Sequence, residues 1–593
     1  MLAGLWVALA ITPAVFAPAL YDDFTLPKQA SLLIATGLML AGLSITGEMM
    51  PRDRWLRRLI AGWMAWTLLC LLAGIDRRGS LLGLYQYRQG FLTQAAYFVL
   101  FLGALSVGRS RGLTGILVPG LMGMAAVTVY TAVQAAGLDP IHWWLDTSER
   151  AIGTIGNANE LAAYATIALA FAGAAAGIRA RWALAVPIAV AASAWFVVLE
   201  AESRSGLGAL VVAQIAITVA GFVLRLGRAH VAKTFALLAA GALAGIVLSA
   251  WAGSAQSTTK RVQSGIESAD AGGSTRISLV RGTIPAIAAS PFWGYGPDGL
   301  YLAFPRHRPA DLKGAFETYD LVVQSSHNWL LDVAANTGIP GVLLLLGLLG
   351  RVAWRSLRRE SGRGEEALPY VWGAMVAYCA ITMLNPLSLA PHAALFVLLG
   401  TLAGRAEPAH VRAVPRTVLI APRLRPLLVA PSVAALFVLA IVMPIADRAA
   451  QRGWEAYESK DFERAPREYG HAATLLAIER GYASRHADTL LTVAAVTSPG
   501  RLREAEEALK QFDADFGFGA SESRAHATAL IGLRRPERTI LAAIDRTLKL
   551  NPHGHAEAAY AQILREAAVR GDGKLAYDDI DHWVYVDRLP NPH

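Results

Sequence analysis

Long apolar runs constrain the fold of this sequence more than any other feature. Several of them reach roughly 17–25 residues, the length that an α-helix needs to cross a bilayer. Hydrophobic residues make up 54% of the chain and charged residues only 17%, whereas a soluble domain carries about 25% charged residues. We therefore predict an all-α polytopic membrane protein.

The apolar runs predict thirteen transmembrane helices. They cover roughly residues 2–20, 30–47, 59–75, 91–107, 113–136, 158–178, 182–200, 206–224, 234–252, 338–354, 368–386, 389–404 and 426–446. Residues 1–446 would thus form a membrane domain, and residues 447–593 a second domain that contains no span.

The basic residues predict the orientation of these helices. The net charge is +9, and the arginines gather in alternate short loops. The arginine-rich segments are Arg52–Arg58, Gly108–Arg111, Arg179–Arg181, Arg225–Lys233, Arg351–Arg363 and Arg405–Arg425. The positive-inside rule places these segments in the cytoplasm. The loop 253–327 and everything after residue 446 then lie outside, and the positive charge is a topology signal rather than a sign of nucleic-acid binding.

The tail after residue 446 is charged and helical in pattern. Gly453–Ala477 resembles a tetratricopeptide helix pair, and Arg546–Ala568 resembles the end of one repeat and the start of the next. The alternative is a generic helical domain. Because repeat arrays present concave binding surfaces, we expect this domain to dock an acceptor or a protein partner rather than to catalyse.

Three stretches resemble ligand-binding motifs, but we interpret none of them as a binding site. Gly294–Gly299 reads GYGPDG, but a dinucleotide fingerprint needs a βαβ unit around it, and this stretch lies in an outer loop, after IAASPFW. We interpret it as a Gly-Pro turn. Asp513–Phe516 and Asp578–Trp583 hold clustered carboxylates, which we interpret as a solvated helix face. No such cluster occurs in the outer loops of the membrane domain, which argues against a divalent metal at the active site.

Three arginines on the outer side are candidates for binding an anion. Arg204 stands at the outer end of the seventh predicted span, where it can either snorkel to the interface or meet an anionic ligand. Arg276 and Arg281 lie in the outer loop, five residues apart. That spacing puts them on different faces of a helix, so we expect only one to face a buried site. The alternative is a pair of solvated arginines.

The sixth predicted span opens with polar residues. Gly153–Tyr164 contains Asn157, Asn159 and Glu160. An ionisable group inside a span is a functional hypothesis by default, and it makes Glu160 and Asn157 candidates for substrate binding. The alternative is that Asn157 or Asn159 only caps the helix.

His327 and Asn328 end the long outer loop. Asn328 can cap a helix that runs to about Thr337, after which Gly338 and Pro340 break it. His327 would then stand near a helix N-terminus, whose positive potential disfavours the imidazolium form and attracts anions. A lone histidine is more often structural, but a neutral imidazole beside an anion site suits a general base for a hydroxyl group.

These motifs together resemble a known family. His327-Asn328, nine residues, Gly338, two residues and Gly341 is similar to the motif of bacterial O-antigen ligases. Their superfamily also holds the Wzy-type polysaccharide polymerases and the bacterial O-linked oligosaccharyltransferases. The supporting stretches occur in the family's order within residues 20–405: Tyr21–Lys28, Gly153–Tyr164, Glu202–Leu210 and Ser274–Leu300.

The resemblance implies a metal-independent, inverting glycosyltransferase of the GT-C type that needs no cofactor. Its donor would be a glycan on undecaprenyl diphosphate at the outer leaflet of the bacterial cytoplasmic (inner) membrane. By the match, Arg204 and Arg276 would hold the diphosphate, and His327 would activate or orient the acceptor hydroxyl. Further candidates for substrate binding are Arg281, Asn328, Asn157 and Glu160.

Three acceptors remain open: lipid A core sugars, a growing glycan or a protein hydroxyl. The His-Asn motif favours a lipopolysaccharide ligase, whereas the repeat-like tail suits a polymerase or a protein-acceptor enzyme. A lipid-glycan flippase or another transporter is the alternative from a different class. The sequence shows no convincing internal repeat, and the polar candidates lie outside the bilayer midplane, which disfavours transport.

Overall fold

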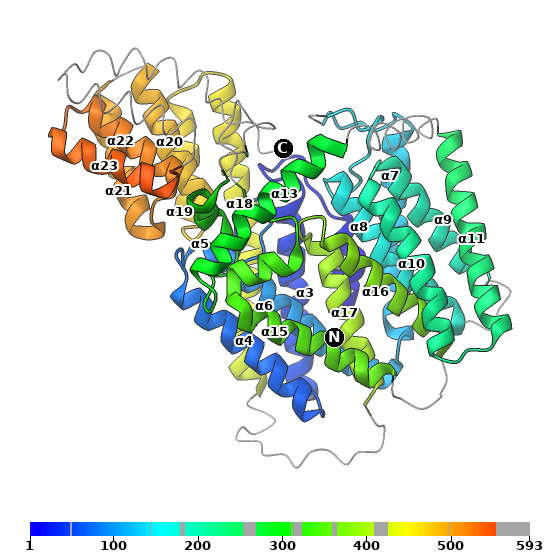
Figure 1. Ribbon diagram of the computed structural model, residues 1–593. Helices are drawn as coiled ribbons and strands as arrows, with labels where there is room; N and C mark the ends of the chain where they lie inside the picture. Colours follow the sequence, from blue (N-terminus) through cyan, green and yellow to red (C-terminus); the bar gives the residue numbers. More distant parts are fainter. Residues whose placement is uncertain are drawn as a thin grey trace.

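Helices form all the regular structure in the described part of the chain (Figure 1). The computed structural model describes residues 1–47, 50–143, 145–177, 184–252, 269–309, 312, 323–357, 365–407, 425–496 and 499–552. No strand occurs among these residues, so the predicted all-α fold class is confirmed.

Eight helices are long and apolar enough to cross a membrane. They are α3 (Thr25–Thr46), α4 (Arg54–Ala73), α6 (Phe91–Arg111), α7 (Thr114–Ala135), α10 (Arg204–Val223), α11 (Arg228–Trp251), α15 (Trp329–Leu357) and α18 (Arg425–Glu458). The chain is therefore a multi-pass membrane protein.

The other five predicted spans are helical, and none of their α-helices is longer than 17 residues. They correspond to Leu2–Ala14, which includes α1 and a π-helical segment, α8 (Ala158–Ala168) with its 3-10 continuation Leu169–Gly177, α9 (Ala185–Glu200), α16 (Leu368–Thr382) and α17 (Leu389–Arg405). Helix α17 matches its predicted span to within one residue, yet protein rather than lipid surrounds much of it. It packs on α6 and is buried from Leu389 to Gly404, and an apolar run looks the same whether lipid or protein surrounds it.

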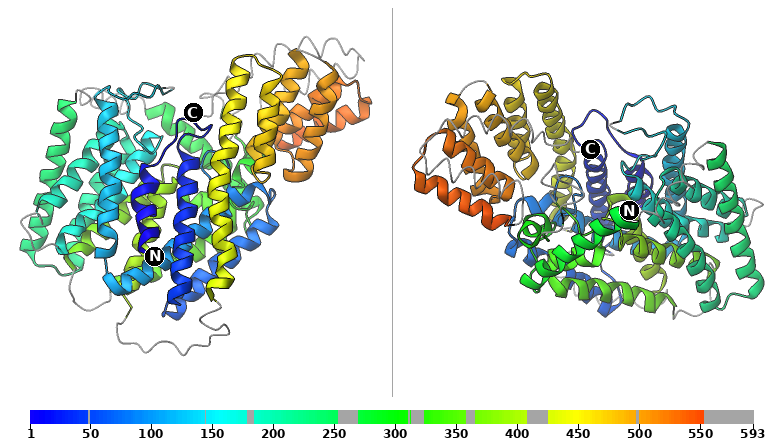
Figure 2. Two further views of the ribbon diagram at one scale, coloured as in Figure 1. Left: turned by 180° about the vertical axis from the view of Figure 1, so that it is seen from behind. Right: turned by 45° about the horizontal axis from the view of Figure 1, so that its top comes forward.

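Described residues of four arginine-rich segments meet at one end of the bundle, which we call the arginine-rich end. There Asp53 pairs with Arg351, whose Nη2 is 2.5 Å from Oδ2, and also with Arg355. Glu407 pairs with Arg109 at 2.8 Å. The C-terminal helices lie at the opposite end, which we call the tail end, as both further views show (Figure 2).

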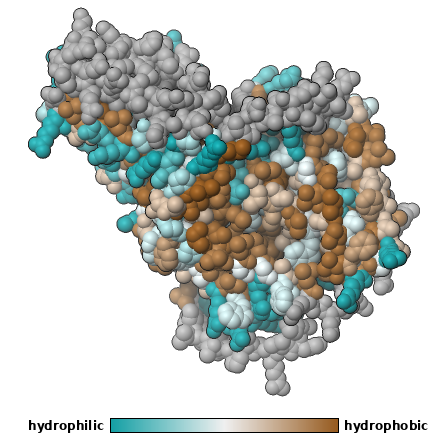
Figure 3. Space-filling view, in the orientation of Figure 1, coloured by the Kyte–Doolittle hydropathy of each residue, from teal (hydrophilic) through white to brown (hydrophobic). Residues whose placement is uncertain are grey.

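Apolar side chains form a band across the helices between these two ends (Figure 3). Many large apolar side chains of the long helices are exposed, such as Leu243 of α11, Leu343 of α15 and Ile441 of α18. A soluble protein rarely exposes a contiguous apolar surface of this extent, and a bilayer accounts for it.

The tail is a stack of helices that begins inside α18. Helix α18 is continuous from Arg425 to Glu458, so it runs through the predicted domain boundary at residues 446 and 447. The stack continues with α19 (Arg464–Leu475), α20 (Arg480–Val496), α21 (Leu502–Phe516), α22 (Ala520–Gly532) and α23 (Glu537–Leu550). Each helix packs on the next, as in helical repeat arrays. The tetratricopeptide resemblance stays a prediction, and Asp578–Trp583 lies outside the described residues.

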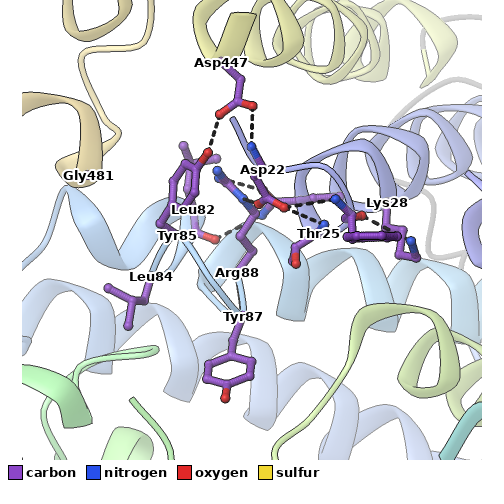
Figure 4. Close-up of polar contacts among 12 residues, drawn as sticks. Asp22, Thr25, Lys28, Leu82, Leu84, Tyr85, Tyr87, Arg88, Asp447 and Gly481 are labelled. Atoms are coloured by element: carbon purple, nitrogen blue, oxygen red, sulfur yellow. Dashed lines mark hydrogen bonds and ion pairs between the residues drawn. The ribbon is translucent and has the colours of Figure 1, made fainter. Parts of the chain in front are cut away.

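A buried polar network fixes the tail to the membrane domain (Figure 4). Arg88 is fully buried, and its Nη1 is 2.9 Å from Glu479 Oε2 of the tail, while its Nε is 3.3 Å from Asp22 Oδ2. Asp447 accepts hydrogen bonds from the backbone N–H of Asp22 (2.9 Å) and from the Tyr85 hydroxyl (2.6 Å). The network therefore joins three segments that are distant in sequence.

Arg480, the residue after Glu479, makes a second ion pair with the membrane domain, in which the tail supplies the positive charge. Arg480 Nη1 is 3.2 Å from Asp76 Oδ2, and its guanidinium lies over the Phe512 ring at 4.6 Å. Removing one partner of a buried ion pair costs about 3–5 kcal/mol, because the other charge is left buried and unpaired. Glu479 and Arg480 thus dock the tail firmly at this end.

The second predicted span, residues 30–47, begins earlier than predicted. Lys28 lies inside α3 rather than in a loop, because α3 already begins at Thr25, whose N–H bonds Asp22 Oδ1 at 2.7 Å. The Lys28 ammonium is buried and donates to backbone carbonyls, including those of Val15 (2.9 Å) and Thr154 (2.6 Å). This lysine ties α3 to the segment before α8.

Candidate functional site

Helix α15 is broken where the sequence predicts. Gly338 has φ 71° and ψ 177°, a conformation that favours glycine, and a Cβ there would collide with the Phe292 carbonyl oxygen. Pro340 has no N–H to continue the helical ladder. The N–H of Ile339 bonds the Pro291 carbonyl instead, at 2.8 Å. The predicted Gly-Ile-Pro-Gly break is thus confirmed.

The GYGPDG stretch docks on this break. The N–H of Tyr295 donates to the carbonyl of Ala335 (2.9 Å), and the N–H of Gly296 donates to that of Asn336 (3.0 Å). These two carbonyls lose helical partners at the break, so the turn satisfies them. Gly294–Gly299 is a turn, and no strand precedes it among the described residues, which confirms that it is not a dinucleotide fold.

The backbone at His327 is held by an aspartate one turn into α15. Asp332 accepts hydrogen bonds from the Ser325 hydroxyl (2.6 Å) and from the Ser326 N–H and hydroxyl (2.7 Å each). The His327 N–H donates to Ser325 Oγ at 3.0 Å. His327 has φ 58°, a left-handed conformation that is uncommon for a residue other than glycine. Such strain persists only where surrounding contacts impose it, and it clusters at functional sites.

Asn328 caps α15, as predicted. Its Oδ1 accepts a hydrogen bond from the N–H of Leu331 at 3.1 Å. Its Nδ2 donates to the carbonyl of Met383 at the end of α16, at 3.3 Å. Asn328 therefore positions the start of α15 against the loop that joins α16 and α17.

The His327 imidazole is half-buried and neutral at neutral pH. Burial, followed by the charge of Arg276, lowers its pKa from 6.5 to about 4. The prediction of a neutral imidazole rested on the helix N-terminus, whereas burial and Arg276 are the main causes. The buried Nδ1 makes no hydrogen bond with any described residue.

The structure brings Arg276 close to His327 and Arg204 close to Arg276. Arg276 is half-buried on α13 (Ala269–Ala289), and burial, followed by the charge of Arg204, lowers its pKa. Arg276 therefore interacts electrostatically with both His327 and Arg204, which is the exposed first residue of α10. Arg281 is exposed on α13. Arg276 thus interacts with a neutral imidazole and with a second cation, a set of groups suited to an anionic ligand.

A chain of hydrogen bonds aligns the helix ends around this site. Asn385 Nδ2 donates to Ser205 Oγ at 2.9 Å, and the hydroxyls of Ser203 and Ser205 lie 3.2 Å apart. Ser203 Oγ in turn donates to Asn159 Oδ1 at 2.9 Å. The starts of α8 and α10 and the loop between α16 and α17 are thus tied together. Sequence analysis missed Asn385 and Ser205, although an Asn-Pro step between two apolar runs was a signal.

Asn157 and Glu160, the two candidates at the start of α8, have different roles in the structure. Asn157 Oδ1 accepts hydrogen bonds from the N–H groups of Asn159 (2.9 Å) and Glu160 (3.3 Å), so the capping alternative is confirmed for Asn157. The Glu160 carboxylate is half-buried and bonds the Ser388 hydroxyl. Glu160 therefore faces the loop between α16 and α17.

A cavity lies beside the loop that ends at His327. Its walls come from α4, the loop before α6, the GYGPDG turn, the first half of α15 and the loop between α16 and α17; Trp63, Tyr87, Asp298, Ser325 and Asp332 are among its lining residues. Sequence analysis found none of these as site residues, because they meet only through the tertiary fold. No group of three or more His, Cys, Asp or Glu side chains that could hold a metal ion occurs among the described residues.

Residues 188–346 match the family model described as O-antigen ligase. The match begins in α9, passes the kink of α15, and includes Arg204, Arg276 and His327. It confirms the resemblance to the O-antigen ligase family over this segment. No curated protein matches the chain significantly.

Proposed function

We propose that this protein transfers a glycan from undecaprenyl diphosphate to an acceptor hydroxyl at the outer face of the bacterial cytoplasmic (inner) membrane. The observation that carries the proposal is the grouping of Arg276 with both Arg204 and His327 inside the segment that matches the O-antigen ligase family. These residues lie at the tail end of the bundle, where a lipid-linked diphosphate would sit at the membrane edge.

Each of the three residues has a chemical task in this reaction. The acceptor oxygen attacks the anomeric carbon, the bond from that carbon to the diphosphate oxygen breaks, and undecaprenyl diphosphate leaves with the bonding electrons. Arg204 and Arg276 stabilise the charge that develops on the diphosphate, and fixed cations act strongly in a site of low dielectric. The neutral imidazole of His327 takes the acceptor proton. Attack from the face opposite the leaving group inverts the anomeric centre.

The proposed orientation has a direct test. The arginine-rich end should face the cytoplasm, because short cytoplasmic loops carry an excess of arginine and lysine. Reporter fusions after residue 300 and after residue 458 should read external, and a fusion after residue 357 should read internal. An internal signal after residue 300 or residue 458 would refute this orientation.

The reaction itself can be assayed with the purified full chain. Lipid-linked glycan serves as the donor, and a rough lipopolysaccharide core, a second portion of lipid-linked glycan and a Ser/Thr peptide serve as candidate acceptors. We expect a mass gain of one glycan on one of them, and we expect it to persist in excess chelator. Transfer to the second lipid-linked glycan would identify a polymerase, and transfer to the peptide a protein O-oligosaccharyltransferase. Absence of transfer to every acceptor would refute the proposal and favour a transporter.

A further inference from the structure

The cavity beside His327 is directly connected to the proposed catalytic group. Ser325 lines the cavity, and its hydroxyl oxygen accepts the His327 N–H at 3.0 Å. Asp332, which holds this loop, lines the cavity as well. A ligand in the cavity would therefore lie against the segment that sets the position of the imidazole.

The charges of the cavity differ from those of the arginine site. Asp298 and Asp332 line it, and no arginine or lysine is among its described lining residues. Burial raises the Asp298 pKa to about 7, while hydrogen bonds from the N–H groups of Leu84 and Gln89 oppose this rise. When they are ionised, the carboxylates of Asp298 and Asp332 repel an anionic ligand from the cavity. The diphosphate is thus directed to Arg204 and Arg276, and the cavity is left for a neutral part of a substrate.

The walls combine flat apolar surfaces with amide groups. Trp63 and Tyr87 supply aromatic surface, and Gln89, Gln94 and Gln324 supply amides. Gln324 Oε1 is buried and has no hydrogen-bond partner among the described residues, which costs free energy unless a ligand donates to it.

The tail supports one wall of this cavity. Tyr87 and Gln89 line the cavity on either side of Arg88, which is anchored to Glu479 of the tail and to Asp22. In Figure 4 the Tyr87 ring points away from the Arg88 network. The Arg88 side chain thus contacts the tail, and the side chains of Tyr87 and Gln89 line the cavity. The docked tail therefore holds this wall of the cavity in place.

We propose that this cavity binds a neutral sugar ring of the acceptor, so that the acceptor is a carbohydrate rather than a protein hydroxyl. This inference rests on the proposed function. A sugar ring has hydroxyl groups that both donate and accept hydrogen bonds, which amide and carboxylate side chains match, and C–H faces that pack on aromatic rings. A serine or threonine side chain in an extended peptide would leave most of these polar groups unsatisfied.

Two variants test the cavity without touching the arginine site. Gln324→Leu removes the buried amide at similar volume, and Val333→Trp fills the cavity from α15. The matched controls are Gln86→Leu, an exposed residue of the loop that bears Tyr87, and Leu346→Trp, an exposed residue of α15. Kinetics are measured with the acceptor that the wild type uses, by varying acceptor and lipid-linked donor separately.

We expect the acceptor KM to rise about tenfold in Gln324→Leu, the effect of about 1.4 kcal/mol, and more in Val333→Trp. The donor KM should stay unchanged, and both controls should match the wild type. If Val333→Trp does not elute as a folded species, Gln324→Leu decides alone. An unchanged acceptor KM overturns the inference, as does a rise in the donor KM alone, which would mean that the donor sugar occupies the cavity. Use of the Ser/Thr peptide alone by the wild type also overturns it, whereas absence of any wild-type transfer refutes the proposed function instead.

Discussion

His327→Ala should lower the turnover of glycan transfer about 10²–10⁴-fold, the usual contribution of a positioned general base. Binding of the lipid-linked donor should stay largely intact, because Arg204 and Arg276 are proposed to hold the diphosphate. The fold should also persist, since the side chain is half-buried and its backbone is held by Ser325. Turnover and donor binding are measured separately on the purified protein.

His142→Ala is the matched control, because His142 is an exposed histidine of the loop before α8. It should leave turnover unchanged. If His327→Ala transfers glycan at the wild-type rate, His327 only begins the helix. If it loses donor binding instead, its role belongs with the arginines.

The pH profile separates a base from a positioning group. The pKa of His327 is about 4, so its base form should dominate above that pH, and the rate should fall only as the pH drops through about 4. This limb should be absent from the residual activity of His327→Ala. The contribution of His327 to the free energy of unfolding also decreases as the pH falls. The unfolded chain takes up the proton first, near its pKa of about 6.5, so this contribution is fully present above that pH and is lost as the pH falls toward 4.

The local features of the site were predictable from the sequence because they depend on neighbouring residues. Asn328 caps a helix, and Gly338 and Pro340 break it, through properties of the residues themselves. The helical position of all thirteen spans followed in the same way from the apolar runs. The lengths of some of them did not, because burial by protein and burial by lipid select the same residue types.

The tertiary partners could not be predicted. Arg88 stands in a short loop, where its charge indicates only membrane orientation, and its partner Glu479 lies 391 residues further along the chain. Asp298 belongs to a glycine-rich turn whose sequence suggests no carboxylate site, yet it lines the cavity. Pairings of this kind are set by which helix ends meet, and a single sequence does not contain that information.

The grouping of charges at the site also explains how one enzyme would sort two substrates. Arg276 lies on α13, which packs on α14 (Leu300–His307) and on α15, whereas the carboxylates of the cavity come from the turn before α14 and from α15 itself. His327 is connected to both groups. An anion attracted by the arginines and a neutral sugar held by the cavity would thus meet at the imidazole, which is the geometry that a direct transfer requires.

Arg276→Lys should lower kcat/KM for the lipid-linked donor about 10²-fold or more, in line with the loss of one preorganised donor to a developing charge. Lysine keeps the charge but loses the bidentate fork that matches a phosphate. Arg276→Gln also removes the charge, so it should lower donor use further and raise the pKa of His327 above 4. That pKa should stay below 6.5, because burial is the larger cause of the shift and remains. Both variants are compared by donor kinetics and by the position of the acid limb.

Arg306 provides the control for Arg276, because it is an exposed arginine of α14 in the same outer loop. Arg306→Lys and Arg306→Gln should leave donor kinetics and the acid limb unchanged, since an exposed charge is screened by solvent and salt. The half-buried Arg276 acts where the dielectric is lower, so its charge reaches His327 and the diphosphate site with less screening. If the Arg276 and Arg306 variants have equal kinetics, Arg276 is a solvated arginine without a role in donor binding. Binding of the diphosphate would then depend on Arg204 alone.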